Sequence, residues 1–486
     1  MKKLLIIFIL IVTSSIIVNG QSIDSLKVEV GTIGTVASKN YLPLWLTANR
    51  FGVITDQQWD FATHVKASNS FTIGRSYNPI YEKVDRSIKV DYSVDLYNNS
   101  HFGKVVVPEL FVKGRYRKIQ VLAGRFKQII GEVDPDLSSG SLGVSGNALP
   151  ITKISIAIPA YMDVPFTNGF IQFKGHFANG WMGHDQYMKK ALLHEKTLYG
   201  RIGKGKLKLY GGIQHYAVWG GYRADSYEGK ALDKNFKGFI NVLFGLEAND
   251  GSVPDSIRPN RPGDQRGVIE GGIEWENDAV RINLNHQTPF DQGLGIDIRN
   301  VDRLVSLNII NKREDAVLRK LVVEFIYTKQ MNDFTPIVFR DSYYNNGVYK
   351  TGWEYHDHIV GTPLFINRVR GQHYFSDVKP FDWDAPGKSI PGLSNIISNR
   401  VVGGHVGFLL GLNSNLTSKT MVTITKNYGY FATANFIPAK MQSYSLEEVS
   451  WNIPGKSLSL TCGLAFDFGQ LSKNFGSMIG LQWHLE

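Results

Sequence analysis

The chain has 486 residues, a formal net charge of +10, 49 glycines, 12% aromatic residues and one cysteine, Cys462. A single cysteine excludes an intrachain disulfide, and with it a small secreted module held together by disulfides. The basic residues are scattered along the chain, whereas a nucleic-acid-binding protein would gather them on one face. We therefore expect no nucleic-acid partner.

The N-terminus has the layout of a secretory signal peptide, which we place at residues 1–20. Two lysines open it, an apolar run covers residues 4–12, and Gly20 ends a stretch of small or short residues suited to a signal peptidase. The apolar run is shorter than the about 20 residues that span a bilayer, which disfavours an uncleaved anchor. Cleavage removes two lysines from the net charge of +10 and leaves +8 on residues 21–486.

Alternation of apolar and polar residues recurs along the rest of the chain, the pattern of a strand with a different environment on each face. The alternating runs, in chain order, are residues 26–30, 87–97, 206–214, 271–285, 321–327, 458–469 and 479–485. Asn277-Asp278 divides one run into a hairpin with a tight turn. No second apolar stretch is long enough for a membrane helix, so any membrane span has to be made of strands.

The last two runs are each about 10 residues long, which is enough to cross a membrane at a tilt. We therefore predict an all-β fold, a closed antiparallel transmembrane β-barrel over residues 21–486, with a soluble β-sandwich as the alternative. The chain ends on Leu485-Glu486, whereas many closing strands of bacterial barrels end on an aromatic residue.

Two long irregular stretches interrupt the strands, near residues 249–267 and 334–397. Loops of this length are usually functional or disordered, and the aromatic content of the second argues against disorder. Because barrels place short turns in the periplasm and long loops outside, we assign both stretches to the extracellular face.

Motifs for catalysis are absent from the sequence. Two Gly-Lys-Ser tripeptides lack the preceding glycine of a phosphate loop, and there is no Gly-x-Ser-x-Gly elbow. In His356-Asp357-His358, an extended segment would point both histidines one way, but no third metal ligand is signalled. We read this motif as a polar loop or lumen position, and expect no enzyme, no cofactor and no metal.

The stretch 334–397 also combines aromatic residues with acids and amides. Sugars present C–H faces that stack on Trp and Tyr, and hydroxyl groups that need Asp, Asn or His partners. The predicted polysaccharide-binding residues are Tyr343, Tyr344, Trp353, Tyr355, His356, Asp357, Asp382 and Trp383. A self-packed plug loop and an aromatic girdle at the membrane interface are the alternatives for these residues.

Three parts of the chain carry a family resemblance. They are residues 43–54 (PLWLTANRFGVI), residues 124–160, whose most specific part is LSSGSLGVSGN at 137–147, and residues 169–221, which contain KGHFANGW, HEKTLYGRIG and GGIQHYAVWGG. Together they resemble the capsule assembly Wzi family of outer-membrane proteins, in the form found in Bacteroidetes. Leu149 stands where the relatives usually have an arginine, so no role is carried over to it.

The resemblance implies a barrel of roughly 18 strands whose extracellular loops hold capsular polysaccharide in a lectin-like way, without chemistry. Enterobacterial members carry a small helical element at the N-terminus, but residues 21–40 here have the pattern of a strand. We therefore expect a monomeric protein of the Gram-negative outer membrane that contacts its lipids, binds capsular or other surface polysaccharide, and supports capsule assembly and attachment. A passive porin or channel is the alternative, and a barrel hydrolase is the least favoured.

Overall fold

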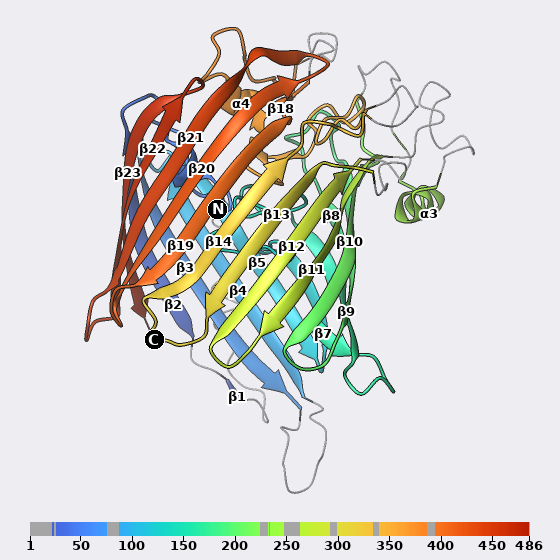
Figure 1. Cartoon of the computed structure of the whole chain (residues 1–486), viewed down its shortest axis with the longest axis vertical. Helices are drawn as coiled ribbons and strands as arrows, with labels where there is room; N and C mark the ends of the chain where they lie inside the picture. The colour runs from blue at the N-terminus through green and yellow to red at the C-terminus, as the bar shows by residue number, and fades with distance from the viewer. Residues whose placement is uncertain are drawn as a thin grey trace, which may run out of the picture.

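The computed structural model describes residues 22–23, 26–74, 87–223, 232, 234–246, 263–291, 299–333, 340–385 and 394–485. Within them, 18 antiparallel strands close into one barrel (Figure 1), which confirms the predicted fold class. The first and last strands complete the ring, because β2 pairs with β3 on one side and with β23 on the other. Val28 lies opposite Leu485 in this closing pair.

The predicted alternating runs all fall on barrel strands, and the turn at Asn277-Asp278 joins β11 to β12. A two-residue strand, β1 (Ser22–Ile23), pairs with β3 beside the ring. The barrel strands are β2 (Lys27–Ala37), β3 (Trp59–Ile73), β4 (Ile88–Asn99), β5 (Lys104–Tyr116), β6 (Ile119–Arg125), β7 (Lys153–Asp163), β8 (Ile171–Trp181), β9 (Leu192–Ile202), β10 (Leu207–Trp219), β11 (Asp264–Glu276), β12 (Val280–Phe290), β13 (Arg303–Asn311), β14 (Leu318–Tyr327), β19 (Val401–Gly411), β20 (Leu416–Tyr430), β21 (Ala434–Asn452), β22 (Leu458–Gly469) and β23 (Lys473–Leu485).

The outer face of the barrel is apolar and the inner face is polar, as alternation requires. Val65, Leu198 and Ile424 are exposed on the outside, whereas Asp95 and Gln214 are buried inside. Aromatic rings are exposed outside near both ends of the strands, as an interfacial girdle requires: Trp59, Trp181 and Phe468 at one end and Trp275, Trp451 and Trp483 at the other. In the described part of the chain, no helix is long and apolar enough to cross a membrane.

The two ends of the barrel differ in their connections (Figure 1). Short turns such as residues 203–206, 277–279 and 412–415 join strands at one end, here called the turn end, where β23 also finishes. Long connections leave the other end, here called the loop end. Residues 74–87 connect two strands at the turn end, and most of them lie outside the described residues.

The two long irregular stretches differ from their predicted form. The first is shorter, because β11 begins at Asp264, and residues 249–262 lie outside the described part. The second contains short elements of its own, and its described residues 340–385 and 394–397 pack mainly inside the barrel. These elements are β15 (Glu354–Tyr355), β16 (His358–Ile359), β17 (Ile366–Asn367), α4 (Arg368–Gly371) and β18 (Ile396–Ser398).

Three connections fold into the lumen and form what we call the plug: residues 38–58, 126–152 and the described part of 340–400. The first includes one helical turn, α2 (Leu44–Thr47), and follows the strand predicted near the N-terminus. Trp45, Leu142 and Trp353, one from each connection, belong to a single buried apolar cluster. The lumen of the barrel therefore holds a packed apolar core, whereas the lumen of an open pore would hold water.

Polar contacts fix the plug to the barrel wall, among them contacts with the neighbouring strands β14, β19 and β20. Trp45 Nε1 donates to Thr423 Oγ1 on β20 at 3.2 Å, and His405 Nε2 on β19 lies 2.6 Å from the Leu137 carbonyl. Near the turn end, the Lys320 ammonium on β14 is 3.2 Å from Asp134 and 2.5 Å from Asp136. Lys320 is the third residue of its strand, so the plug extends through most of the depth of the lumen.

Close packing explains two of the glycines of residues 137–147. A Cβ on Gly143 would lie 2.2 Å from the Gln214 side chain, and one on Gly140 would lie 2.8 Å from Pro363. Both distances are too short for a stable contact between atoms. Neither glycine position therefore has room for a side chain. Leu149 is buried in the same apolar cluster, which assigns it a packing role.

Candidate functional site

Four of the eight predicted polysaccharide-binding side chains lie in the interior of the plug. Trp353 is 0% exposed and its Nε1 donates to the Gly143 carbonyl at 2.7 Å. The other three are 3% exposed or less, and each hydroxyl has a hydrogen-bond partner: Tyr343 with Asp302, Tyr344 with the Leu142 carbonyl, and Tyr355 with Arg125. Their rings do not face solvent, so the structure favours the plug alternative for these four residues.

A buried glutamate lies beside these rings. Glu354 Oε2 accepts hydrogen bonds from Asn367 Nδ2 and Asn395 Nδ2, both at 2.7 Å. Burial raises the pKa of the Glu354 carboxyl to about 7, because removal from water disfavours the charged form. This carboxyl holds plug segments together and is remote from solvent.

His356 and Asp357 form a tight turn, not the extended segment that the sequence suggested. Their φ values of 47° and 68° are those of the two-residue turn between β15 and β16. His356 Nδ1 is 3.0 Å from Asp185 Oδ2, and His358 Nδ1 is 2.8 Å from the His356 carbonyl. Burial lowers the pKa of His356, although Asp185 opposes the shift. Among the described residues, no group of three His, Cys, Asp or Glu is arranged to hold a metal ion.

Trp383 is partly exposed, and its ring is held from two sides. Phe381 and Tyr187 lie 5.3 Å and 6.3 Å from it between ring centroids. Arg223 Nη1 donates to the Trp383 carbonyl at 2.8 Å, which fixes the backbone of this residue. An aromatic ring that is held by its neighbours and partly exposed is suited to stacking against an apolar ligand face.

Carboxylates flank Trp383 on the surface. Asp382 and Asp384 are both exposed, and Asp384 Oδ1 accepts a hydrogen bond from Lys189 Nζ at 2.5 Å. This contact lowers the pKa of Asp384, so the group stays ionised at neutral pH. The Asp382 carboxylate accepts a hydrogen bond from the Asp384 backbone N–H at 2.9 Å, which orients the turn.

The connection between β8 and β9, residues 182–191, contacts both the His356-Asp357 turn and the segment around Trp383, and so joins them into one surface. Its Asp185 contacts His356, its Tyr187 contacts Trp383, and its Lys189 contacts Asp384. We call this surface the loop-end patch, made of Asp185, Lys189, His356, Asp357, Asp382, Trp383 and Asp384. Sequence reasoning missed Asp185 and Lys189 because their partners are about 170 to 195 residues away and no local pattern marks them.

Comparison with known proteins yields fold matches only. No family model matches the chain, and no curated protein matches it. A solved structure described as Wzi, an outer membrane protein involved in group 1 capsule assembly in Escherichia coli and a carbohydrate binding β-barrel, is similar with a TM-score of 0.53. The match has 11% identity and covers 93% of this chain and 83% of that one.

Two porin-like structures from Pseudomonas aeruginosa are also similar, at 7% identity each. OccK5 matches with a TM-score of 0.47 over 95% of this chain and 97% of that chain. OpdQ matches with a TM-score of 0.46 over 96% of this chain and 99% of that chain. At these identities the likeness concerns the barrel fold alone.

Proposed function

We propose that this chain is an outer-membrane barrel whose loop-end patch binds a capsular or other surface polysaccharide and supports capsule assembly and attachment at the cell surface. The proposal rests on one observation above all: Trp383 has a partly exposed ring that packs against Tyr187 and Phe381 and lies between two exposed carboxylates. Sugars bind to this combination, because the ring takes the C–H face and the carboxylates accept hydroxyl hydrogen bonds.

Orientation and compartment support the same proposal. Outer-membrane barrels place their long loops outside the cell, which would put the loop-end patch on the cell surface. Residues 1–20 are proposed to be the cleaved export signal, and they lie outside the described residues. The fold resemblance to a structure described as a carbohydrate binding β-barrel is in keeping with a binding role without catalysis.

The alternative of a passive channel finds no support in the plug. The three plug connections fill the lumen with a common apolar core and ion pairs that reach close to the turn end. We propose that the protein acts as a monomer with its ligand outside the barrel, in contact with outer-membrane lipids around its wall.

The test is binding of the purified barrel to polysaccharide from its own strain, measured by calorimetry. Replacing Trp383 with Ala should weaken binding by about 1–2 kcal/mol, or roughly 5- to 30-fold, since one stacking surface is lost. Trp181→Ala is the matched control, because Trp181 is exposed at the loop end of β8 but faces outward from the barrel wall.

Two outcomes contradict the proposal. One is equal binding by the Trp383→Ala and Trp181→Ala variants, which would leave the patch without a role. The other is a deletion strain whose cell-bound capsule is unchanged. Trp353 and Tyr355 are unsuitable for this test because both are buried, so their loss would act on plug packing.

A further inference from the structure

Outside the barrel, a short helix lies against the loop end of the wall. It is α3 (Phe236–Phe244), beside β10 (Figure 1), nine residues long. The Asn235 side chain accepts a hydrogen bond from Gly238 N at 2.7 Å, and Gly245, with φ of 60°, ends the helix in the left-handed region. Val242 is buried against the wall, whereas Phe236 and Phe244 are 78% and 67% exposed. An amphipathic helix with exposed aromatic rings is typical of a membrane interface.

Lys196 on β9 connects this helix to the wall. Its register partners are Phe177 and His215, so its side chain shares their outward face. Its ammonium donates to the Leu243 carbonyl, at the C-terminal end of α3. In the described part of the chain, no carboxylate forms an ion pair with Lys196. Charged groups on the lipid-facing side of a barrel are costly, so a lysine there calls for an anionic partner.

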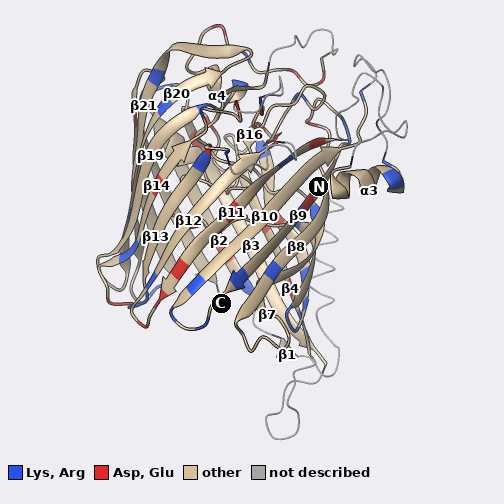
Figure 2. Ribbon diagram, turned by 45° about the vertical axis from the view of Figure 1, so that its right-hand side comes forward, with Lys and Arg blue, Asp and Glu red and all other residues tan. Residues whose placement is uncertain are grey.

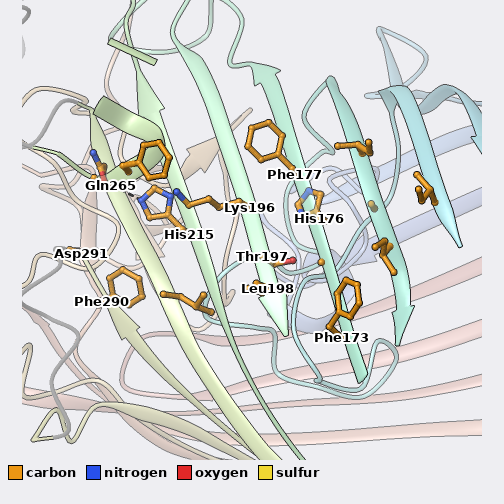
Figure 3. Close-up of a pocket in the computed structure, with 18 residues that line it drawn as sticks. Phe173, His176, Phe177, Lys196, Thr197, Leu198, His215, Gln265, Phe290 and Asp291 are labelled. Carbon is orange, nitrogen blue, oxygen red and sulfur yellow. Dashed lines mark hydrogen bonds between the residues drawn. The ribbon is translucent and has the colours of Figure 1, made fainter. Parts of the chain in front are cut away.

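An apolar groove of about 660 Å³ adjoins this lysine (Figure 3). Its floor and sides are made mainly by Ile156, Phe173, Leu198, Ile213 and Phe244, which come from four strands and the end of α3. Lys196 extends toward His215 at one side of the groove, as Figure 3 shows, and its ammonium contacts the end of α3.

The groove is hollow because small residues lie on the outward face of the wall. Gly175 stands next to Leu198 in the strand register and lines the groove without a side chain, and Ala157 on β7 contributes only a methyl group. Asp291 lies at the edge, but its carboxylate accepts a hydrogen bond from the Ser342 backbone N–H in the plug. Asp291 is the only acidic residue among the described residues that line the groove, and its carboxylate is bound to the plug. The charged group that remains within the groove is the Lys196 ammonium.

We propose that this groove binds a phosphorylated lipid A of the outer leaflet, with one acyl chain against the apolar wall and a phosphate on Lys196. Charge complementarity carries the assignment: a lysine binds phosphate as a point charge, and the groove supplies the apolar surface that an acyl chain needs. Lys234 and Lys237 lie at the N-terminal end of α3, and Figure 2 shows basic residues on this helix, but the groove adjoins its C-terminal end, so among the described residues Lys196 supplies the cation. Lys196 lies in the half of β9 nearer the loop end, which matches the outer leaflet.

The experiment titrates the full-length barrel in detergent with lipid A and with the same lipid after removal of its phosphates, using native mass spectrometry. The wild-type protein should prefer the phosphorylated form by about tenfold or more. Lys196→Gln should abolish this preference, and Lys196→Arg should restore it. Leu198→Trp, which fills the groove beside the lysine but keeps its charge, should weaken binding of both forms.

Lys473→Gln is the matched control, since Lys473 is exposed at the loop end of β23 beside the exposed ring of Phe468, on another part of the wall. Equal affinity for lipid A with and without phosphate would overturn the proposal, as would equal effects of Lys196→Gln and Lys473→Gln. A glycerophospholipid that binds as tightly as lipid A would overturn the choice of lipid. If hydrogen exchange shows α3 released by Lys196→Gln while Leu198→Trp binds lipid A normally, Lys196 is a helix anchor and the proposal fails.

Discussion

Replacing Trp353 with Ala should open the plug while leaving the barrel intact. Trp353 is 0% exposed, lies 5.3 Å from Tyr216 between ring centroids, and donates its indole N–H to the Gly143 carbonyl. It therefore joins one plug segment both to a second and to the wall. The strand hydrogen bonds of the barrel do not depend on this side chain, so the change should act on the plug alone.

The expected cost follows from burial. Removing a fully buried tryptophan typically costs about 3–5 kcal/mol, part of it from the cavity that remains. The Gly143 carbonyl would also lose its donor, which is costly in a buried place. Because about 1.4 kcal/mol is a factor of ten, the ratio of open to closed plug should rise roughly 100- to 4,000-fold.

Two assays follow the plug directly. Limited proteolysis within residues 340–385 should speed up, and single-channel conductance in planar bilayers should rise above that of the wild-type barrel. The heat-modifiable gel mobility of a folded barrel should stay unchanged. Trp383→Ala is the matched control from the same segment, because that ring is partly exposed and its loss leaves a smaller cavity. If Trp353→Ala alters neither proteolysis nor conductance, the plug is not held by this contact and the reasoning is wrong.

Two more predictions concern charged groups in the plug and on the wall beside it. Because burial raises the pKa of Glu354 from 4.5 to about 7, the folded plug favours the protonated carboxyl; that stabilisation is full below pH 4.5 and is lost as the pH rises through 7. Proteolysis of the plug should therefore be faster at pH 8 than at pH 5, and Glu354→Gln should reduce the difference; a pH dependence identical in wild type and variant would refute this cause. Lys320→Met should loosen the plug by about 3 kcal/mol, since it leaves the buried Asp134 without its cation, and thermal proteolysis should detect this; an unchanged profile would show that Asp134 finds another partner.

The barrel could be predicted because each strand shows, in its own alternation of apolar and polar residues, that its two faces meet different environments. Residues 458–469 alternate strictly, and β22 has these bounds in the structure. The hairpin at Asn277-Asp278 was predicted in the same way, since a tight turn between two alternating runs leaves little choice of register. Neighbouring strands pair in chain order around the ring, so local pattern was enough.

The plug could not be predicted because its contacts are distant in sequence. Trp353 and Gly143 are 210 residues apart, and an aromatic-rich segment has the same composition whether it packs inward or faces a sugar. Burial separates the predicted binding residues into two groups: four rings support the plug, and His356, Asp357, Asp382 and Trp383 remain as candidates for binding. Helix α3 also escaped the sequence reasoning, although Asn235 and Gly245 are a recognisable pair of caps.

A filled lumen constrains where a polysaccharide can act. Asp134 and Asp136 of the plug pair with Lys320 near the turn end, and Trp353 is locked at the other side of the plug core. If the proposed function holds, the filled lumen would keep a chain of sugars at the loop-end patch and would not pass it inward. Retention and transport are separable on this basis. Trp383→Ala should impair retention with the lumen still closed, whereas Trp353→Ala should open the lumen, and a variant set in which both properties change together would contradict a surface-binding role.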